Sequence, residues 1–261
     1  MADAGARALR FVAARCAGDP LDPSLRITLN FHPDRTLPAL VADGVYVSQF
    51  VTGTSNGGLT AYPGGDRWRW ERRMFGGAYD DAPPHARPVY GALNFRRDPY
   101  GAAPRFGSAH LRLNAAALHR ATFCYPDSYL EPTDFGVAAR MPLIALARAA
   151  AVADPLDDYV EAHVHGPVRL DRDIEAVVLD PSYMDSEIPP GLPVEWHPGF
   201  RLPVEELVRH ADYRGRRHVD LGVALAVDGV LTPKLIGDAA GRHDPQDLKR
   251  VWHLLARFGR R

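Results

Sequence analysis

The sequence predicts an α+β fold with a largely antiparallel sheet, either continuous or split into two halves. An N-terminal helix precedes the sheet, and a helical tail follows it. Three observations favour this class. Short segments with the two-residue alternation of strands recur between residues 26 and 179, with long loops between them. Too few helices separate these segments for the regular βαβ order of a doubly wound sheet. Helical patterns dominate only after residue 200.

Each element has its own local signal. The spacing of apolar residues predicts a helix over Ala2–Ala17, which Gly18-Asp-Pro ends. Alternating or short apolar runs between turn residues predict strands at Arg26–His32, Val89–Phe95, Ala109–Leu113, Ala121–Cys124, Tyr159–Pro167 and Ile174–Leu179. The 3.6-residue period predicts helices at Arg67–Phe75, Met141–Ala153, Leu202–His210, His218–Val227 and Pro245–Phe258.

The domain division follows from this change of pattern. A chain of 261 residues can bury one large core or two small ones. The proline-rich stretch Ser186–Gly199 separates the strand-rich part from the helical part. We therefore expect residues 1–185 to form an α+β catalytic-like domain, and residues 186–261 to form a helical extension packed on it as one compact unit.

Composition limits the class of protein. The formal net charge is −1, so the overall charge does not indicate nucleic-acid binding, although a local basic patch stays open. Cys16 and Cys124 lie too far apart to form a metal motif or a disulfide framework, which favours a reducing cytoplasm. No apolar run approaches the ~20 residues of a membrane span, and no signal-peptide pattern begins the chain. We expect a cytoplasmic protein, and secretion without a cleaved signal stays open.

The segment Tyr159–Pro167 carries the main candidate site. As a strand, it directs Val160, Ala162 and Val164 to one face. Its other face carries Tyr159, Glu161, His163 and His165. A carboxylate between an aromatic ring and two imidazoles can form the wall of a reactive cleft. The alternative is an exposed strand face with ordinary polar residues.

Further candidate residues lie earlier in the chain. His32 ends a predicted strand, where functional side chains often emerge from a rigid support. The loop Gly53–Gly58 offers hydroxyl and amide groups between glycines, without the spacing of a phosphate-binding loop. The stretch Tyr62–Pro84 mixes arginines with aromatic residues, a combination that can form a lid over a cleft or grip phosphates.

Three longer motifs carry a resemblance over most of the chain, from about Leu25 to Phe258. They are the runs Tyr46–Leu59, Pro63–Glu71 and Arg87–Asn94. Together they resemble a bacterial family of proteins of unknown function, DUF3626. That resemblance implies no activity.

A second resemblance concerns the order of the candidate residues. A histidine at the end of an early strand, a later Thr-Ser pair and a glutamate on a late strand resemble the ADP-ribosyltransferase superfamily. In that superfamily a split antiparallel sheet holds NAD in a cleft. The resemblance implies that Glu161 is catalytic together with His32, that His32 or Arg35 holds NAD, and that Thr54, Ser55 and Gly57 support the NAD pocket. Beyond the resemblance, we expect Arg67 to bind the pyrophosphate and Tyr79 or Trp70 to stack on nicotinamide.

The implied reaction consumes NAD as a substrate. It is ADP-ribosyl transfer to an unknown macromolecular acceptor, or simple NAD hydrolysis. Loss of nicotinamide leaves positive charge on the ribose, and a carboxylate such as Glu161 stabilises that oxocarbenium-like state.

Two other functions stay open. In a metal-dependent hydrolase, His163 and His165 would present two imidazoles to one metal, with His32, Asp34 or Glu161 completing the set. In a non-enzymatic binding module, the arginine- and aromatic-rich stretch would grip nucleic acid or a protein partner.

Overall fold

The central element of the computed structural model is an eight-stranded sheet. The structure describes residues 3–53, 60–186 and 191–260. The order of the strands is β10-β9-β4-β1-β3-β7-β5-β6, hydrogen-bonded from edge to edge. All neighbours pair antiparallel except β9 and β10, which run parallel. The predicted α+β class with a largely antiparallel sheet is therefore confirmed, with the sheet continuous.

The predicted strands correspond closely to the observed ones. The strands of the sheet are β1 (Ile27–Phe31), β3 (Val89–Leu93), β4 (Ala109–Leu113), β5 (Ala121–Tyr125), β6 (Asp134–Val137), β7 (Glu161–Val164), β9 (Ile174–Leu179) and β10 (Val194–Trp196). Two small pairs lie outside it: β2 (Val45–Tyr46) with β8 (Val168–Arg169), and β11 (Leu202–Pro203) with β12 (Val230–Leu231). The sequence pattern does not indicate β6 and β10, which are short and follow prolines.

The helices are mostly short. They are α1 (Ala4–Ala13), α2 (Pro33–Asp43), α3 (Gln49–Thr52), α5 (Asp66–Phe75), α6 (Leu143–Ala149), α7 (Val204–Leu207), α8 (Ala211–Arg214), α9 (Arg216–Leu225), α10 (Pro233–Asp238) and α11 (Pro245–Phe258). Short 3₁₀ helices are η1 (Pro84–Ala86), η2 (Pro104–Phe106), η3 (Ala115–Arg120), η4 (Ser128–Leu130), η5 (Pro155–Asp157), η6 (Pro181–Tyr183) and η7 (Val208–His210). Helix α2 begins directly after His32, because proline is well suited to the first helical position.

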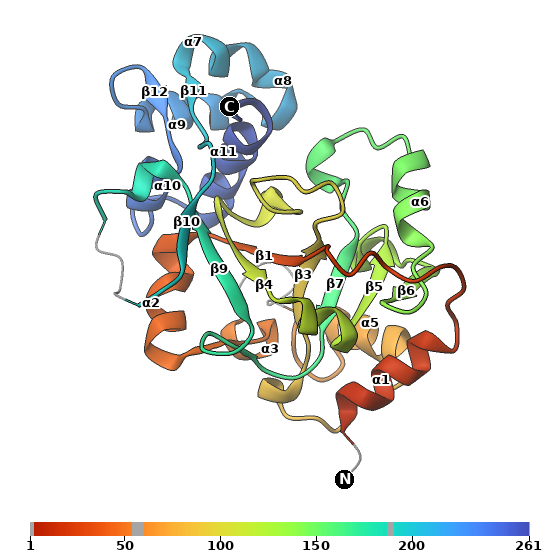
Figure 1. Ribbon diagram of the computed structural model, residues 1–261. Coiled ribbons are helices and arrows are strands. Elements are labelled where there is room, and N and C mark those ends of the chain that lie inside the picture. Colours follow the sequence, from red (N-terminus) through yellow and green to blue (C-terminus); the bar gives the residue numbers. More distant parts are fainter. Residues whose placement is uncertain (1–2, 54–59, 187–190, 261) are drawn as a thin grey trace.

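The two faces of the sheet differ in chemistry. One face is apolar and forms the largest core, to which α2 and α6 contribute leucines such as Leu40 and Leu143. The opposite face carries polar side chains on β7 and β5. Helices α1 and α5 pack over this part of the sheet, with Val12 and Phe75 among the residues that bury Cys124. Figure 1 shows α1 and α5 lying together beside β5, β6 and β7.

The middle of the polar face is covered by the loop between β3 and β4. Thr28 accepts a hydrogen bond from the backbone of Ala102, and Asn30 bonds the backbone of Tyr100 and Ala103. This loop also receives the C-terminal part, because the indole of Trp252 donates to the carbonyl of Pro104. The loop therefore separates the two halves of the polar face.

The C-terminal helices gather at one end of the sheet, beyond β9 and β10 (Figure 1). They bury their own apolar cluster, in which α11 contributes Val251 and Trp252. Strand β10 belongs to the main sheet, so the chain after residue 185 also supplies a strand. No described helix has both the length and the apolar character needed to cross a membrane.

Candidate functional site

Strand β7 positions the polar cluster that the sequence indicates. Val160, Ala162 and Val164 lie in the apolar core, as the alternation predicts. On the other face, Glu161 is 6% exposed and His163 is fully buried. The interpretation of this face as an ordinary exposed strand surface is therefore wrong, because α1 and α5 cover it. Because buried polar groups need hydrogen-bond partners, the buried carboxylate and imidazoles must bond to one another or to neighbouring polar groups.

Glu161 is the centre of this cluster. Its Oε1 lies 2.9 Å from Nε2 of His163 and 3.8 Å from Sγ of Cys124, and it accepts a hydrogen bond from the backbone of Ser128 at 3.3 Å. Burial raises the pKa of Glu161, but the hydrogen bond from His163 and the charges of His163 and Arg67 outweigh this effect, so the pKa lies below its ordinary value. Glu161 is therefore an ionised carboxylate inside the protein.

A chain of hydrogen bonds runs from Glu161 to the far end of the cluster. Oγ1 of Thr122 lies 3.1 Å from Nδ1 of His163 and 3.1 Å from Nε2 of His165. The hydroxyl of Tyr79 lies 2.7 Å from Nδ1 of His165. Because the Glu161 carboxylate can only accept, Nε2 of His163 is the donor in the contact with it. Burial lowers the pKa of His165 to about 3, which agrees with a neutral ring.

Helix α5 supplies a second layer above these residues. Oε2 of Glu71 accepts from Nη1 of Arg87 at 2.6 Å, and its Oε1 accepts from the hydroxyl of Tyr90. Both members of this ion pair are buried. Burial raises the pKa of Glu71 to about 7 although the charge of Arg87 opposes the shift. Arg87 also donates to the carbonyl of Tyr79, which ties α5 to the end of the hydrogen-bond chain.

Arg67 lies between the two acidic groups. Its guanidinium packs on the ring of Tyr90, and Nη1 donates to the hydroxyl of Ser128 at 3.4 Å. Although Arg67 is buried, its Nε has no hydrogen-bond partner among the residues that the structure describes. A buried donor without a partner is rare, because each one costs about 1–3 kcal/mol. Arg67 therefore has a donor that a ligand oxygen could satisfy.

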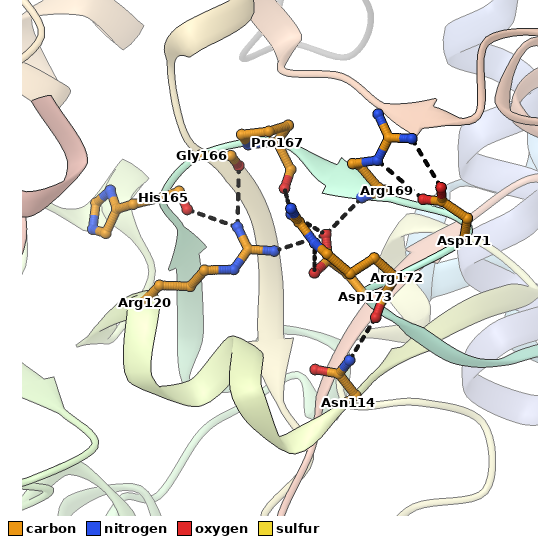
Figure 2. Close-up of polar contacts among 9 residues, drawn as sticks. All are labelled: Asn114, Arg120, His165, Gly166, Pro167, Arg169, Asp171, Arg172 and Asp173. Atoms are coloured by element: carbon orange, nitrogen blue, oxygen red, sulfur yellow. Dashed lines mark hydrogen bonds and ion pairs between the residues drawn. The ribbon is translucent and has the colours of Figure 1, made fainter. Parts of the chain in front are cut away.

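The end of β7 is held by a separate ionic network, shown in Figure 2. Nη1 of Arg120 donates to the carbonyl oxygens of His165 and Gly166, and Nη2 lies 3.0 Å from Asp173. Asp173 in turn binds Arg172 and accepts from the backbone of Arg169. This network holds the backbone of the turn that follows His165, whereas Tyr79 and Thr122 hold its imidazole.

The structure brings only some of the predicted residues together. Glu161 and Arg67 share one cluster, and Tyr79 belongs to it through His165, on which its ring stacks. The predicted residues Thr54, Ser55 and Gly57 lie outside the described residues.

His32 and Arg35 lie elsewhere. Strands β1 and β7 both run antiparallel to β3, so they point in the same direction. His32 follows the end of β1, whereas Glu161 begins β7, and the two residues therefore lie toward opposite ends of the sheet. His32 packs against Trp252 of α11 instead. Arg35 is exposed in the first turn of α2. The structure does not bring these two residues to Glu161.

His163 on β7 and His165 just after it share Thr122, but their other partners differ. His163 is grouped with Glu161 and Cys124, whereas His165 is joined to Tyr79. The sequence pattern does not indicate Cys124 as part of the site, because it lies 37 residues from Glu161 and has no motif around it. The role of Cys124 becomes visible only once β5 is paired with β7, because Cys124 and Glu161 are then direct partners.

The remaining arginines of α5 face solvent and are paired with carboxylates. Arg69 pairs with Asp66, and Arg73 pairs with Glu131. Arg72 pairs with Asp80 in the same way. The positive charge of the arginine- and aromatic-rich stretch is therefore largely balanced at the surface.

Comparison with known proteins gives a family but no activity. No curated protein matches the chain. The model of one family, described as protein of unknown function (DUF3626), matches residues 26–151 and 138–258. These segments span most of the chain, as the resemblance of the three motifs indicates. The chain therefore belongs to the DUF3626 family.

Proposed function

We propose that the protein cleaves the bond between nicotinamide and ribose in NAD, and transfers the ADP-ribosyl group to a macromolecular acceptor or to water. The observation that carries this proposal is a buried Glu161 whose pKa is lowered in part by the charge of Arg67, together with the Nε–H of Arg67, which has no partner among the described residues. A carboxylate and a guanidinium are the two groups that a positively charged sugar and a phosphate-bearing ligand require.

The proposed role of Glu161 is electrostatic. When the glycosidic bond breaks, neutral nicotinamide leaves with the bonding electron pair and positive charge develops on the ribose. A carboxylate in a site of low dielectric stabilises that charge far more than it would in water. It can also accept a hydrogen bond from the ribose 2′-hydroxyl, which strengthens as the charge forms. The acceptor nucleophile or water then attacks the same carbon.

The proposed role of Arg67 is to hold a phosphate oxygen. A guanidinium binds phosphate through hydrogen bonds of fixed geometry, and its charge is permanent. The hydrogen-bond chain through Thr122 and His163 also supports the proposal, because the contact of His163 with Oε1 fixes the orientation of the Glu161 carboxylate. A side chain held in place beforehand needs no reorganisation when the charge develops.

The test compares Glu161→Gln with a matched control. Full-length protein is incubated with NAD and a bacterial lysate that supplies acceptors, and free nicotinamide is measured. Glu175→Gln is the control, because Glu175 is an exposed carboxylate on β9 that pairs with arginines. We expect the wild type and Glu175→Gln to release nicotinamide, and Glu161→Gln to be slower by a factor of about 100 or more. Absence of release from the wild type, or equal rates for Glu161→Gln and the wild type, would overturn the proposal.

A further inference from the structure

We propose that Cys124, Glu161 and His163 form a binding site for a divalent cation of the zinc class. Sγ of Cys124, the carboxylate oxygen of Glu161 and a ring nitrogen of His163 all lie within 4.8 Å of one another. All three residues are buried. A thiol, an imidazole and a carboxylate together form a set that suits zinc, whereas magnesium and calcium prefer oxygen ligands alone.

The distances among the ligand atoms fit a tetrahedral ion. Zinc lies about 2.3 Å from sulfur and about 2.0–2.2 Å from nitrogen or oxygen, so two ligands of one ion are about 3.3–3.6 Å apart. The sulfur of Cys124 lies 3.8 Å from Oε1 of Glu161 and 3.8 Å from Nε2 of His163. The nitrogen and the oxygen are 2.9 Å apart. Shifts of about 0.5 Å in these side chains would therefore seat an ion, and water would take the fourth position.

The backbone holds the three ligands on rigid elements. Cys124 on β5 and Glu161 on β7 are direct partners in the sheet, and His163 lies two residues further along the same face. A histidine that binds a metal usually donates its other ring N–H to a neighbouring oxygen. Oγ1 of Thr122 lies 3.1 Å from Nδ1 of His163 and can accept that hydrogen bond.

Binding is an exchange of protons for the metal and involves no oxidation. Three metal–ligand bonds form, and the thiol proton of Cys124 leaves to solvent. His163 binds the metal through Nε2 and keeps its proton on Nδ1, which donates a hydrogen bond to Oγ1 of Thr122. The hydroxyl hydrogen of Thr122 then turns to Nε2 of His165, whose proton lies on Nδ1, opposite the hydroxyl of Tyr79. Metal binding therefore becomes weaker as the pH falls.

One consequence rests on the proposed function. Because the ion would take a lone pair of Glu161 and neutralise its charge, zinc would inhibit cleavage of NAD. Binding of the ion itself does not depend on that activity, so the two proposals can fail separately.

The experiment uses cobalt as a spectroscopic probe of the full-length protein after treatment with a chelator. Tetrahedral cobalt bound to a thiolate absorbs through a sulfur-to-metal charge-transfer band. The variant Cys124→Ala removes the proposed ligand. Cys16→Ala is the matched control, because Cys16 is the other buried cysteine and bonds the carbonyl of Val12. Circular dichroism checks the fold, and Cys124→Ser replaces Cys124→Ala if the latter does not fold.

We expect the wild type and Cys16→Ala to bind one equivalent of cobalt with the charge-transfer band, which zinc then abolishes by displacement. Cys124→Ala should lose the band, and His163→Gln should bind at least tenfold more weakly. Failure of the wild type to bind cobalt stoichiometrically, or an unchanged band in Cys124→Ala, would overturn the inference. If the metal-free protein binds cobalt in this way but releases no nicotinamide from NAD, this inference stands and the proposed function fails.

Discussion

The variant Thr122→Val tests the hydrogen-bond chain directly. It removes one oxygen and keeps the branched shape of the side chain. That oxygen lies 3.1 Å from Nδ1 of His163 and 3.1 Å from Nε2 of His165. Thr122 and both imidazoles are buried, so water cannot replace the lost partner without rearrangement. Two ring nitrogens are therefore left unsatisfied.

The expected loss of stability follows from the number of ring nitrogens left without a partner. Each buried polar group left without a partner costs about 1–3 kcal/mol. Two such groups in one network give a loss of about 2–6 kcal/mol in the free energy of unfolding, with the lower end favoured because neighbouring effects do not add fully. Such a loss is a large part of the stability of a typical domain.

The assay is urea unfolding at pH 7.5, followed by fluorescence, with the midpoint and slope compared among variants. The matched control is Thr133→Val, because Thr133 is exposed, and its loss should stay within about 0.5 kcal/mol. If Thr122→Val unfolds within about 0.5 kcal/mol of the wild type, the hydrogen-bond chain does not contribute as the geometry indicates.

Two further predictions concern buried charge. Replacing Arg87 by methionine leaves Glu71 buried without its ion-pair partner, and we expect a loss of about 3 kcal/mol at pH 8. The loss should be smaller at pH 6. The pKa of Glu71, already raised to about 7 by burial, rises further in the variant, so the folded state binds the extra proton and stability falls as the pH increases. Urea unfolding at both pH values measures this, and a loss under about 1 kcal/mol at both would contradict it. The second prediction is acid sensitivity of the wild type. Burial lowers the pKa of His110 and of His165 to about 3, against about 6.5 in the unfolded chain. The unfolded state then binds more protons below pH 6.5, so stability decreases as the pH falls, by about 2 kcal/mol per histidine at pH 5. Equal stability at pH 7.5 and pH 5 would refute this reasoning.

Several features of the site could be predicted because they are local. The period of two along Tyr159–Pro167 is enough to place Glu161 and His163 on one face and the valines on the other. Strands β4 and β9 begin and end at the predicted residues. Helix α5 follows from its flanking glycines and its spacing.

The partners of Glu161 could not be predicted in the same way. Cys124, Ser128 and Arg67 come from three other segments, and only the pairing of strands and the packing of α5 bring them to β7. The resemblance to a known order of motifs placed His32 beside Glu161. The order of residues along the chain does not determine whether the end of β1 lies beside the start or the end of β7.

By itself, the sequence determined which side chains of β7 share a face, because alternation of strand residues depends only on the backbone. It also determined the class of fold, through the succession of strand and helix periods. Only the tertiary structure decided that this polar face is buried and joined to Cys124, Thr122 and Tyr79. The reason is that burial and long-range pairing depend on which distant segments pack together, and no local period records that choice.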